Sequence, residues 1–326
     1  MGSELPLFPV QASSIAPMVD HLLYFLLAVA AFFSVGIFLC IFYFAVRYRR
    51  RSESELPAPI EGAISLELLW SVVPFGLTMI MFVWGASVFF TMSRPPDNAQ
   101  QIYVVAKQWM WKLQHTEGQR EINELHIPVG QAVKLTMTSE DVIHSFYVPA
   151  FRVKQDVLPG RYTQLWFTAT QLGNFPLFCA EYCGLDHARM GGNIVVMAPA
   201  DYSRWLEGHG GAQSLAARGA TLFRNHGCSG CHGANASVHA PDLDGLYGRW
   251  VQLVDGSTVI ADDRYIRDAI LLPKQRLVAG FAPIMPSFSG QLSEEDLLAL
   301  IAYLKSTSST ANDPPAIGSE STHEHD

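Results

Sequence analysis

Two long apolar runs constrain this chain more than any other feature. One extends from His21 to Val46 and the other from Leu68 to Ser93, and neither contains Asp, Glu, Lys or Arg. As helices with a rise of about 1.5 Å per residue, each would be roughly 39 Å long, which exceeds the ~30 Å hydrocarbon core of a bilayer. Pro74 does not exclude a helix, because neighbouring helices can satisfy the freed backbone groups. Since charged residues make up only 16% of the chain, low for a soluble protein, we predict a transmembrane hairpin with helices at about 21–46 and 68–93.

The connection between the two runs is strongly basic and contains Arg47, Arg49, Arg50 and Arg51. Arginines beside a membrane segment mark the cytoplasmic side. We therefore expect an external N-terminal segment (1–20), and everything after residue 93 outside the membrane in a periplasm-like space. A signal peptide is the alternative for the first run, although twenty-six uncharged residues are long for its apolar part. The formal net charge of −8 argues against nucleic acid as a partner.

Residues 100–200 are expected to form a β-sandwich or barrel. Apolar residues recur there with a period close to two, and Pro-Gly or Gly-rich turns such as IPVG (127–130) and LPG (158–160) separate the segments. Two expected strand faces carry Val133, Leu135 and Met137, and Val142, His144, Phe146 and Val148. This pattern is typical of antiparallel sheets packed on each other.

The stretch CAEYCGLDHARM (179–190) concentrates soft metal-binding groups late in this segment. Thiolate and thioether ligands select copper, zinc or iron–sulfur clusters, and imidazole suits copper and zinc. Two thiolates, Cys179 and Cys183, could bridge two copper ions. Three alternatives remain open on spacing alone: a structural zinc site, a disulfide between the two cysteines, and Met190 as an ordinary core residue.

A second cysteine pair lies in CSGCH (228–232), which is the attachment motif of a c-type haem. Cys228 and Cys231 would add to the haem vinyl groups, and His232 would ligate the iron. A redox disulfide is the alternative, but such a disulfide is expected in a βαβ unit and does not require the histidine. A methionine as sixth ligand raises the reduction potential, and Met285 in APIMPSF is the candidate, with His209, His226 and His239 as rivals.

The C-terminal part is expected to be a helical domain over residues 214–307. A last helix is predicted to begin at Ser293, with Asp296 completing a capping box. Residues 201–213 are expected to be a linker because GHGGAQ (208–213) is rich in glycine. Residues 308–326 are expected to be a disordered tail, with His323 and His325 solvated.

Four stretches together resemble subunit II of haem–copper cytochrome c oxidases. They are ELLWSVVP (67–74), DVIHSFYVP (141–149), KQDVLPGR (154–161) and CAEYCGLDHARM, and the resemblance covers about residues 18–200. It implies a cupredoxin-like domain with a binuclear copper centre, CuA. The implied ligands are the bridging Cys179 and Cys183, the terminal His144 and His187, the Met190 thioether and the Glu181 carbonyl oxygen.

The same resemblance implies three further roles. The Glu181 side chain would reach a magnesium or manganese ion shared with subunit I. Glu67, at the start of the second helix, would lie at the mouth of a proton-uptake channel. Trp109, in KQWMWKL, would be the point at which electrons enter; as residues of one strand, Trp109 and Trp111 are expected to face the same way.

The C-terminal segment, with APDLDGLYGR at 240–249, resembles a class I cytochrome c domain. In that family the carbonyl matching Pro241 accepts a hydrogen bond from the axial histidine. The whole chain then resembles subunit II of a caa3-type oxidase, a multidomain membrane protein with a transmembrane hairpin, a cupredoxin-like domain and an all-α cytochrome c domain. The resemblance implies electron transfer from haem c to CuA and on to subunit I, which reduces oxygen to water with proton translocation.

The resemblance also implies partners: subunits I and III, and a donor that is either a soluble or membrane cytochrome c or another respiratory complex. Two alternatives remain open. A nitric oxide reductase can carry a comparable CuA subunit, and a membrane-anchored electron carrier or redox sensor would need no catalytic partner. The match at Glu67 favours the oxidase, and the two-helix hairpin argues against a simple carrier, which one helix would anchor.

Overall fold

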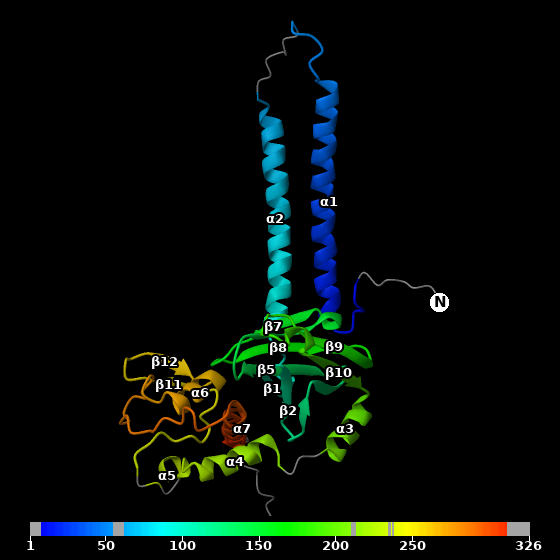
Figure 1. Ribbon diagram of the computed structural model, residues 1–326. Helices are drawn as coiled ribbons and strands as arrows, with labels where there is room; N and C mark the ends of the chain where they lie inside the picture. Colours follow the sequence, from blue (N-terminus) through cyan, green and yellow to red (C-terminus); the bar gives the residue numbers. More distant parts are fainter. Residues whose placement is uncertain (1–7, 55–61, 210–212, 234–235, 237, 312–326) are drawn as a thin grey trace, which may run out of the picture.

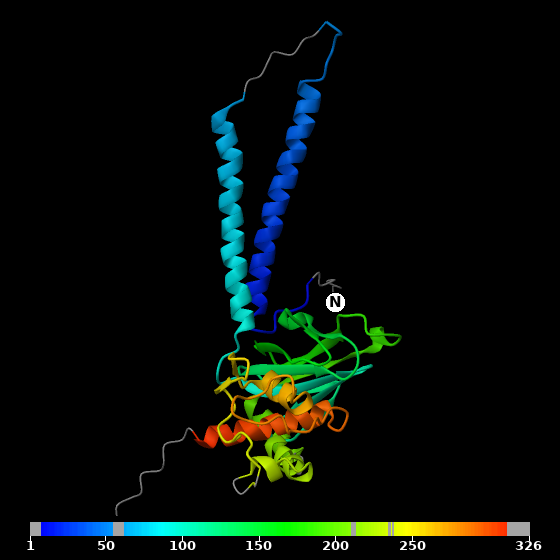
Figure 2. The ribbon, with the colours of Figure 1, turned by 90° about the vertical axis from the view of Figure 1, so that its left-hand side faces the viewer.

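The computed structural model describes residues 8–54, 62–209, 213–233, 236 and 238–311. It consists of a two-helix hairpin, a β-sandwich and a mostly helical C-terminal domain (Figure 1). The hairpin extends from one side of the sandwich, and the C-terminal domain packs against the sandwich flank (Figure 2). The predicted fold class is confirmed.

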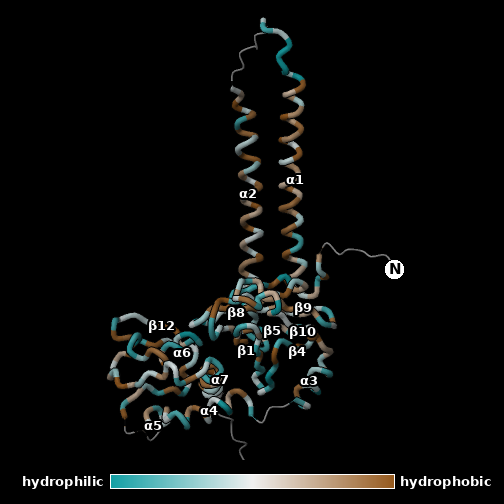
Figure 3. The backbone as a smooth tube through the Cα atoms, in the orientation of Figure 1, coloured by the Kyte–Doolittle hydropathy of each residue, from teal (hydrophilic) through white to brown (hydrophobic). Residues whose placement is uncertain are grey.

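The hairpin helices are α1 (Ala16–Arg47) and α2 (Ile64–Ser93). Both are long and apolar enough to cross a membrane, and Figure 3 shows hydrophobic residues along most of their length. Both begin earlier than the apolar runs. Glu67, predicted to abut the second helix, therefore lies in the first turn of α2, where the helix dipole favours a carboxylate. Pro74 lies inside α2 without ending it.

A buried ion pair ties the start of α1 to the sandwich. The Arg152 guanidinium donates from Nε to Oδ1 of Asp20 at 2.8 Å and from Nη2 to Oδ2 at 2.9 Å. Gln11 donates to the same carboxylate at 2.7 Å. Arg152 has a positive φ of 55°, and its bidentate bond to Asp20 helps to hold this uncommon backbone conformation.

The sandwich consists of two five-stranded sheets with the strand orders β3-β2-β1-β5-β8 and β4-β10-β9-β6-β7. Most neighbouring strands are antiparallel, but β1 pairs with β5, and β4 with β10, in parallel. The strands are β1 (Gln100–Lys107), β2 (Met110–His115), β3 (Arg120–Ile122), β4 (Glu124–Pro128), β5 (Ala132–Ser139), β6 (His144–Val148), β7 (Val153–Val157), β8 (Thr163–Thr168), β9 (Gly173–Cys179) and β10 (Gly191–Met197). The short 3-10 helices η1 (Pro149–Phe151) and η2 (His187–Arg189) interrupt the loops.

The main core lies between the two sheets. The predicted alternation in β5 is confirmed, because Val133, Leu135 and Met137 are all fully buried. In the second predicted set, His144, Phe146 and Val148 lie buried in β6, whereas Val142 precedes the strand and is 38% exposed. Placing Val142 on that strand face was therefore wrong: the strand begins only at His144.

The C-terminal domain is built on two helices in contact, α4 (Leu215–Asn225) and α7 (Glu294–Ala311). The smaller elements are α5 (Ser229–His232), α6 (Asp263–Leu271) and the hairpin of β11 (Trp250–Gln252) with β12 (Thr258–Ile260). The sequence did not predict this hairpin. The predicted capping box of α7 is present, since the Ser293 hydroxyl accepts from the Asp296 amide and the Asp296 carboxylate accepts from Ser293.

Two segments differ from the expected domain limits. Residues 201–208, assigned to the linker, form most of helix α3 (Pro199–Gly208), whose Tyr202 is buried beside His115 of the sandwich. Residues 308–311, assigned to the tail, continue α7. The remaining tail, 312–326, lies outside the described residues.

The C-terminal domain contacts the sandwich through α7 and α4. Tyr103 and Val105, on the face of β1 turned away from the main core, pack with Leu215, Leu298 and Ala302. Strand β1 is thus buried on both faces. Lys112 of β2 also donates to Glu295 of α7 at 3.0 Å, so apolar and charged contacts both fix this interface.

Gly219 permits the close approach of α4 and α7. A Cβ atom there would lie 2.0 Å from the backbone oxygen of Ala299, which cannot move without separating the helices. We expect Gly219→Ala to lower the free energy of unfolding of the C-terminal domain by roughly 1–3 kcal/mol, measured by thermal unfolding of the full chain. Gly208→Ala is the control because its Cβ would meet nothing within 4 Å; equal melting temperatures for both variants would contradict the packing.

Candidate metal centre and haem motif

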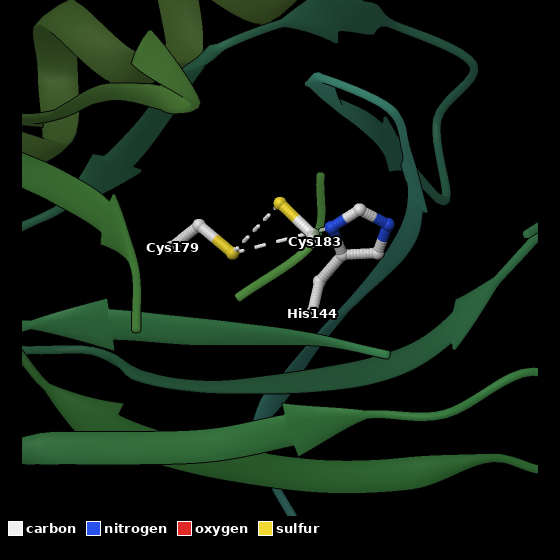
Figure 4. A group of neighbouring side chains, drawn as sticks. All are labelled: His144, Cys179 and Cys183. Carbon is white, nitrogen blue, oxygen red and sulfur yellow. Dashed lines mark hydrogen bonds between the residues drawn. The ribbon is translucent and has the colours of Figure 1, made fainter. Parts of the chain in front are cut away.

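Three soft donors converge at one end of the sandwich (Figure 4). His144 begins β6 and Cys179 ends β9, and these antiparallel strands pair directly. The Cys179 sulfur lies 3.7 Å from the Cys183 sulfur and 4.0 Å from Nδ1 of His144. All three residues are buried, so strand pairing and one loop create a shielded metal-binding group.

The loop between β9 and β10 brings the remaining predicted donors to this group. Nδ1 of His187 lies 3.5 Å from the Cys183 sulfur, and the Met190 sulfur lies 3.7 Å from it. The Glu181 carbonyl oxygen lies 3.2 Å from the Cys179 sulfur. All six predicted donor residues are thus gathered at one place.

The electrostatics of the two thiols favour a bound cation. Burial alone would raise the pKa of Cys179, but hydrogen bonds with His144 and the backbone lower it to about 6. Burial and the adjacent Cys179 thiolate raise the pKa of Cys183 to about 12. Two thiolates this close repel each other, and a metal ion supplies the compensating charge. The donor set therefore fits a thiophilic metal.

Cys179 and Cys183 do not form a disulfide in this structure. A disulfide bond is about 2.05 Å long, whereas the two sulfurs are 3.7 Å apart and both cysteines are free. Met190 is only 2% exposed, as expected for an ordinary core residue. Its sulfur nevertheless lies next to the Cys183 sulfur, where it can also serve as a ligand. By donor chemistry the group could hold one tetrahedral ion or two ions sharing both sulfurs.

Asp141 orients His144, a role that sequence reasoning missed. Its Oδ1 lies 2.8 Å from Nε2 of His144, and the backbone amides of Gln108 and Val142 donate to the same carboxylate. A carboxylate on one imidazole nitrogen leaves the other to face the metal and increases ligand basicity. The sequence could have indicated this role, because Asp141 begins the stretch DVIHSFYVP that also contains His144.

Both tryptophans of KQWMWKL contact the donor group, but not from one strand face. Trp109 lies in the turn before β2, and its indole donates to the Cys183 carbonyl oxygen at 3.2 Å. Trp111 lies in β2, fully buried, with its ring edge-on to His144 at a centroid distance of 6.1 Å. The expected strand alternation was wrong because β2 begins only at Met110.

The CSGCH motif forms the short helix α5, with Cys228 at its N-cap and His232 at its end. Nδ1 of His232 lies 2.8 Å from the Pro241 carbonyl oxygen, so the expected hydrogen bond is present. This hydrogen bond uses Nδ1 and leaves Nε2 of His232 free to bind the haem iron. Both cysteines are free and half-buried, and the arrangement fits covalent haem attachment.

The other predicted residues occupy separate places. Met285 lies half-buried in the loop between α6 and α7. Of its rivals, His226 packs against Phe288, His239 against Phe281 and His209 against Trp205. The Glu67 and Glu181 side chains are exposed, Glu67 at the end of α2 far from the sandwich.

Three family descriptions match successive parts of the chain. "Cytochrome C oxidase subunit II, transmembrane domain" matches residues 3–88, and "Cytochrome C oxidase subunit II, periplasmic domain" matches residues 101–198. "Cytochrome c" matches residues 216–308. The order agrees with the hairpin, the sandwich and the C-terminal domain.

Known proteins with the same description are similar over long stretches. Cytochrome c oxidase subunit 2 of Alkalihalophilus pseudofirmus is 32% identical over 293 residues, which are 85% of this chain and 84% of that protein. The protein of the same name from Thermostichus vulcanus is 29% identical over 63% of this chain and 79% of its own length. A crystal structure of the periplasmic domain of subunit II of cytochrome oxidase from Bradyrhizobium japonicum is 32% identical, covering 36% of this chain and 96% of that one with a TM-score of 0.34.

Proposed function

Since the chain belongs to the cytochrome c oxidase subunit II family and carries a fused cytochrome c domain, we propose which of its residues carry electrons towards subunit I. As in a caa3-type oxidase, electrons enter at the cytochrome c domain, pass to the CuA domain and continue to subunit I in the membrane, where oxygen is reduced to water. The domains after the hairpin are periplasmic. We assign the chain to a bacterial inner membrane, spanned twice.

The CuA ligands are the six donors that converge beside β6 and β9. The side chains of Cys179, Cys183, His144, His187 and Met190 and the Glu181 carbonyl oxygen would hold the copper. When bound, CuA would supply one-electron transfer. The observation that best supports this assignment is that all these donors lie around two sulfur atoms 3.7 Å apart.

The protein around these donors keeps them fixed and dry. Asp141 holds the His144 ring, Trp111 packs against its edge, and Trp109 binds the Cys183 carbonyl oxygen. A rigid, buried site limits rearrangement when charge changes, as electron transfer requires. We assign Trp109 as the residue through which electrons reach the site.

In the cytochrome c domain, Cys228 and Cys231 would attach the haem, and His232 and Met285 would bind its iron. The Pro241 carbonyl fixes the His232 ring through the 2.8 Å hydrogen bond. Fusion replaces diffusional encounter by a high effective concentration, and the α7 interface limits the arrangements of the tethered domain.

Two carboxylates act where the chain meets its partners. Glu181 is exposed and offers an oxygen ligand to a magnesium or manganese ion shared with subunit I, since such ions prefer oxygen donors. Glu67 lies at the opposite, cytoplasmic end of α2, where it marks the entrance of a proton-uptake channel. Subunit III completes the membrane part, and the donor is a cytochrome c or another respiratory complex.

The copper assignment predicts two copper ions per chain and a mixed-valence electron paramagnetic resonance signal. Cys183→Ser should abolish that signal because one bridge is lost. Cys40→Ser is the matched control, since Cys40 is a lone, exposed cysteine of α1, and it should retain both ions. Zinc in place of copper by elemental analysis, or an unchanged signal in Cys183→Ser, would refute the assignment.

The haem assignment predicts that Met285→Ala lowers the reduction potential, because loss of a methionine ligand removes its stabilisation of the reduced iron. The haem should stay attached in denaturing electrophoresis. Redox titration of His239→Ala, a rival ligand, should give the wild-type potential. The opposite pattern, an unchanged potential in Met285→Ala and a changed one in His239→Ala, would identify the histidine instead.

A further inference from the structure

Strand β2 presents two neighbouring residues to two different domains. Trp111 is buried in the main core, with its ring edge-on to His144. Because side chains alternate along a strand, Lys112 lies on the opposite face, beside Val105 of β1 in the strand register. Val105 belongs to the apolar contact with the cytochrome c domain. Lys112 therefore lies at the domain interface, next in the chain to a residue that packs against a copper donor.

Lys112 joins carboxylates of the two domains. Its Nζ donates to Oε1 of Glu140 at 2.9 Å and to Oε1 of Glu295 at 3.0 Å. Lys107 pairs with the other oxygen of Glu140 at 3.2 Å. Burial alone would lower the pKa of Lys112, but its hydrogen bonds with the two carboxylates raise it. Lys112 thus keeps its charge, and one ammonium group holds the sandwich to α7.

The Glu140 end of this network lies beside the metal centre. Glu140 directly precedes Asp141, whose carboxylate lies 2.8 Å from Nε2 of His144. The Glu140 backbone amide donates to the Ala106 carbonyl oxygen at 3.0 Å, which fixes this segment on β1. The residue that orients His144 and the residue that binds Lys112 are therefore held together as one short segment.

The Glu295 end of the network fixes the start of α7. The loop that carries Met285 leads directly into this helix. The preceding residue, Glu294, binds the buried Arg267 of α6, and Nη1 of Arg267 donates to the Gly160 carbonyl oxygen of the sandwich at 3.1 Å. The start of α7 is thus held to the sandwich on two sides, and the Met285 loop is held with it.

We propose that Lys112 is a positioning residue for electron transfer, because it fixes the start of α7 and the Met285 loop relative to the copper donors. The inference rests on the haem-to-CuA transfer proposed above. An isolated exposed ion pair contributes little to stability, but the side chains of Lys112 and Glu295 are only 28% and 26% exposed and belong to a network of four charges. Since the rate of electron transfer falls steeply with the distance between two centres, a shift of the docked domain slows the transfer.

The test uses the purified complete oxidase and the rate at which CuA is reduced after rapid photochemical reduction of the haem. Lys112→Met and Glu295→Gln should each lower this rate at least threefold, and Lys112→Arg should keep the wild-type rate. The double variant should be no slower than the slower single variant, because both substitutions remove the same contact. The two substitutions remove opposite charges, so a purely electrostatic effect on the measured haem and CuA potentials would change the rate in opposite directions.

Lys274→Met is the control, since it removes an exposed lysine of the cytochrome c domain, and it should keep the wild-type rate. The copper and haem spectra of each variant show that its domains are intact. An unchanged rate in Lys112→Met, opposite changes in the two single variants, or effects that multiply in the double variant would overturn the proposal. Absence of first-order transfer in the wild type would instead refute the proposed function, and this inference with it.

Discussion

Two buried sulfur atoms 3.7 Å apart cannot both be ionised unless positive charge lies beside them, and the rest of the structure serves this requirement. The pairing of β6 with β9 brings His144 to Cys179, and the following loop returns His187 and Met190 to Cys183. Asp141 and Trp111 then fix the His144 ring from behind. The sandwich is thus a scaffold that holds these donors close together, and in our proposal bound copper supplies the charge that lets both sulfurs ionise.

Each of the three structural units of the chain has its own role. The hairpin anchors it beside subunit I, and the Asp20–Arg152 ion pair sets the sandwich on that anchor. The cytochrome c domain is held through α7, with Tyr103 and Val105 buried beneath it and Lys112 reaching Glu295. Electron delivery becomes an intramolecular event.

Features encoded by short spacing were predictable from the sequence. The Cys179–Met190 stretch, the Cys228–His232 motif and the Ser293 capping box depend on neighbours a few residues apart, and the structure contains each arrangement. Features that depend on distant packing were not. The second buried face of β1 exists only because α7 docks on it, nearly two hundred residues later, and the turn containing Trp109 is set by where β2 begins. Helix α3 was missed because its buried Tyr202 packs on the sandwich, whereas the glycines after it suggested a linker.

The central claim is that electrons pass from the haem to CuA within one chain. Rapid reduction of the haem, followed by the absorbance of CuA, measures this transfer directly. Our account predicts a first-order rate that stays the same when the protein is diluted tenfold. A rate that falls in proportion to concentration would mean that electrons pass between molecules, and it would contradict the account.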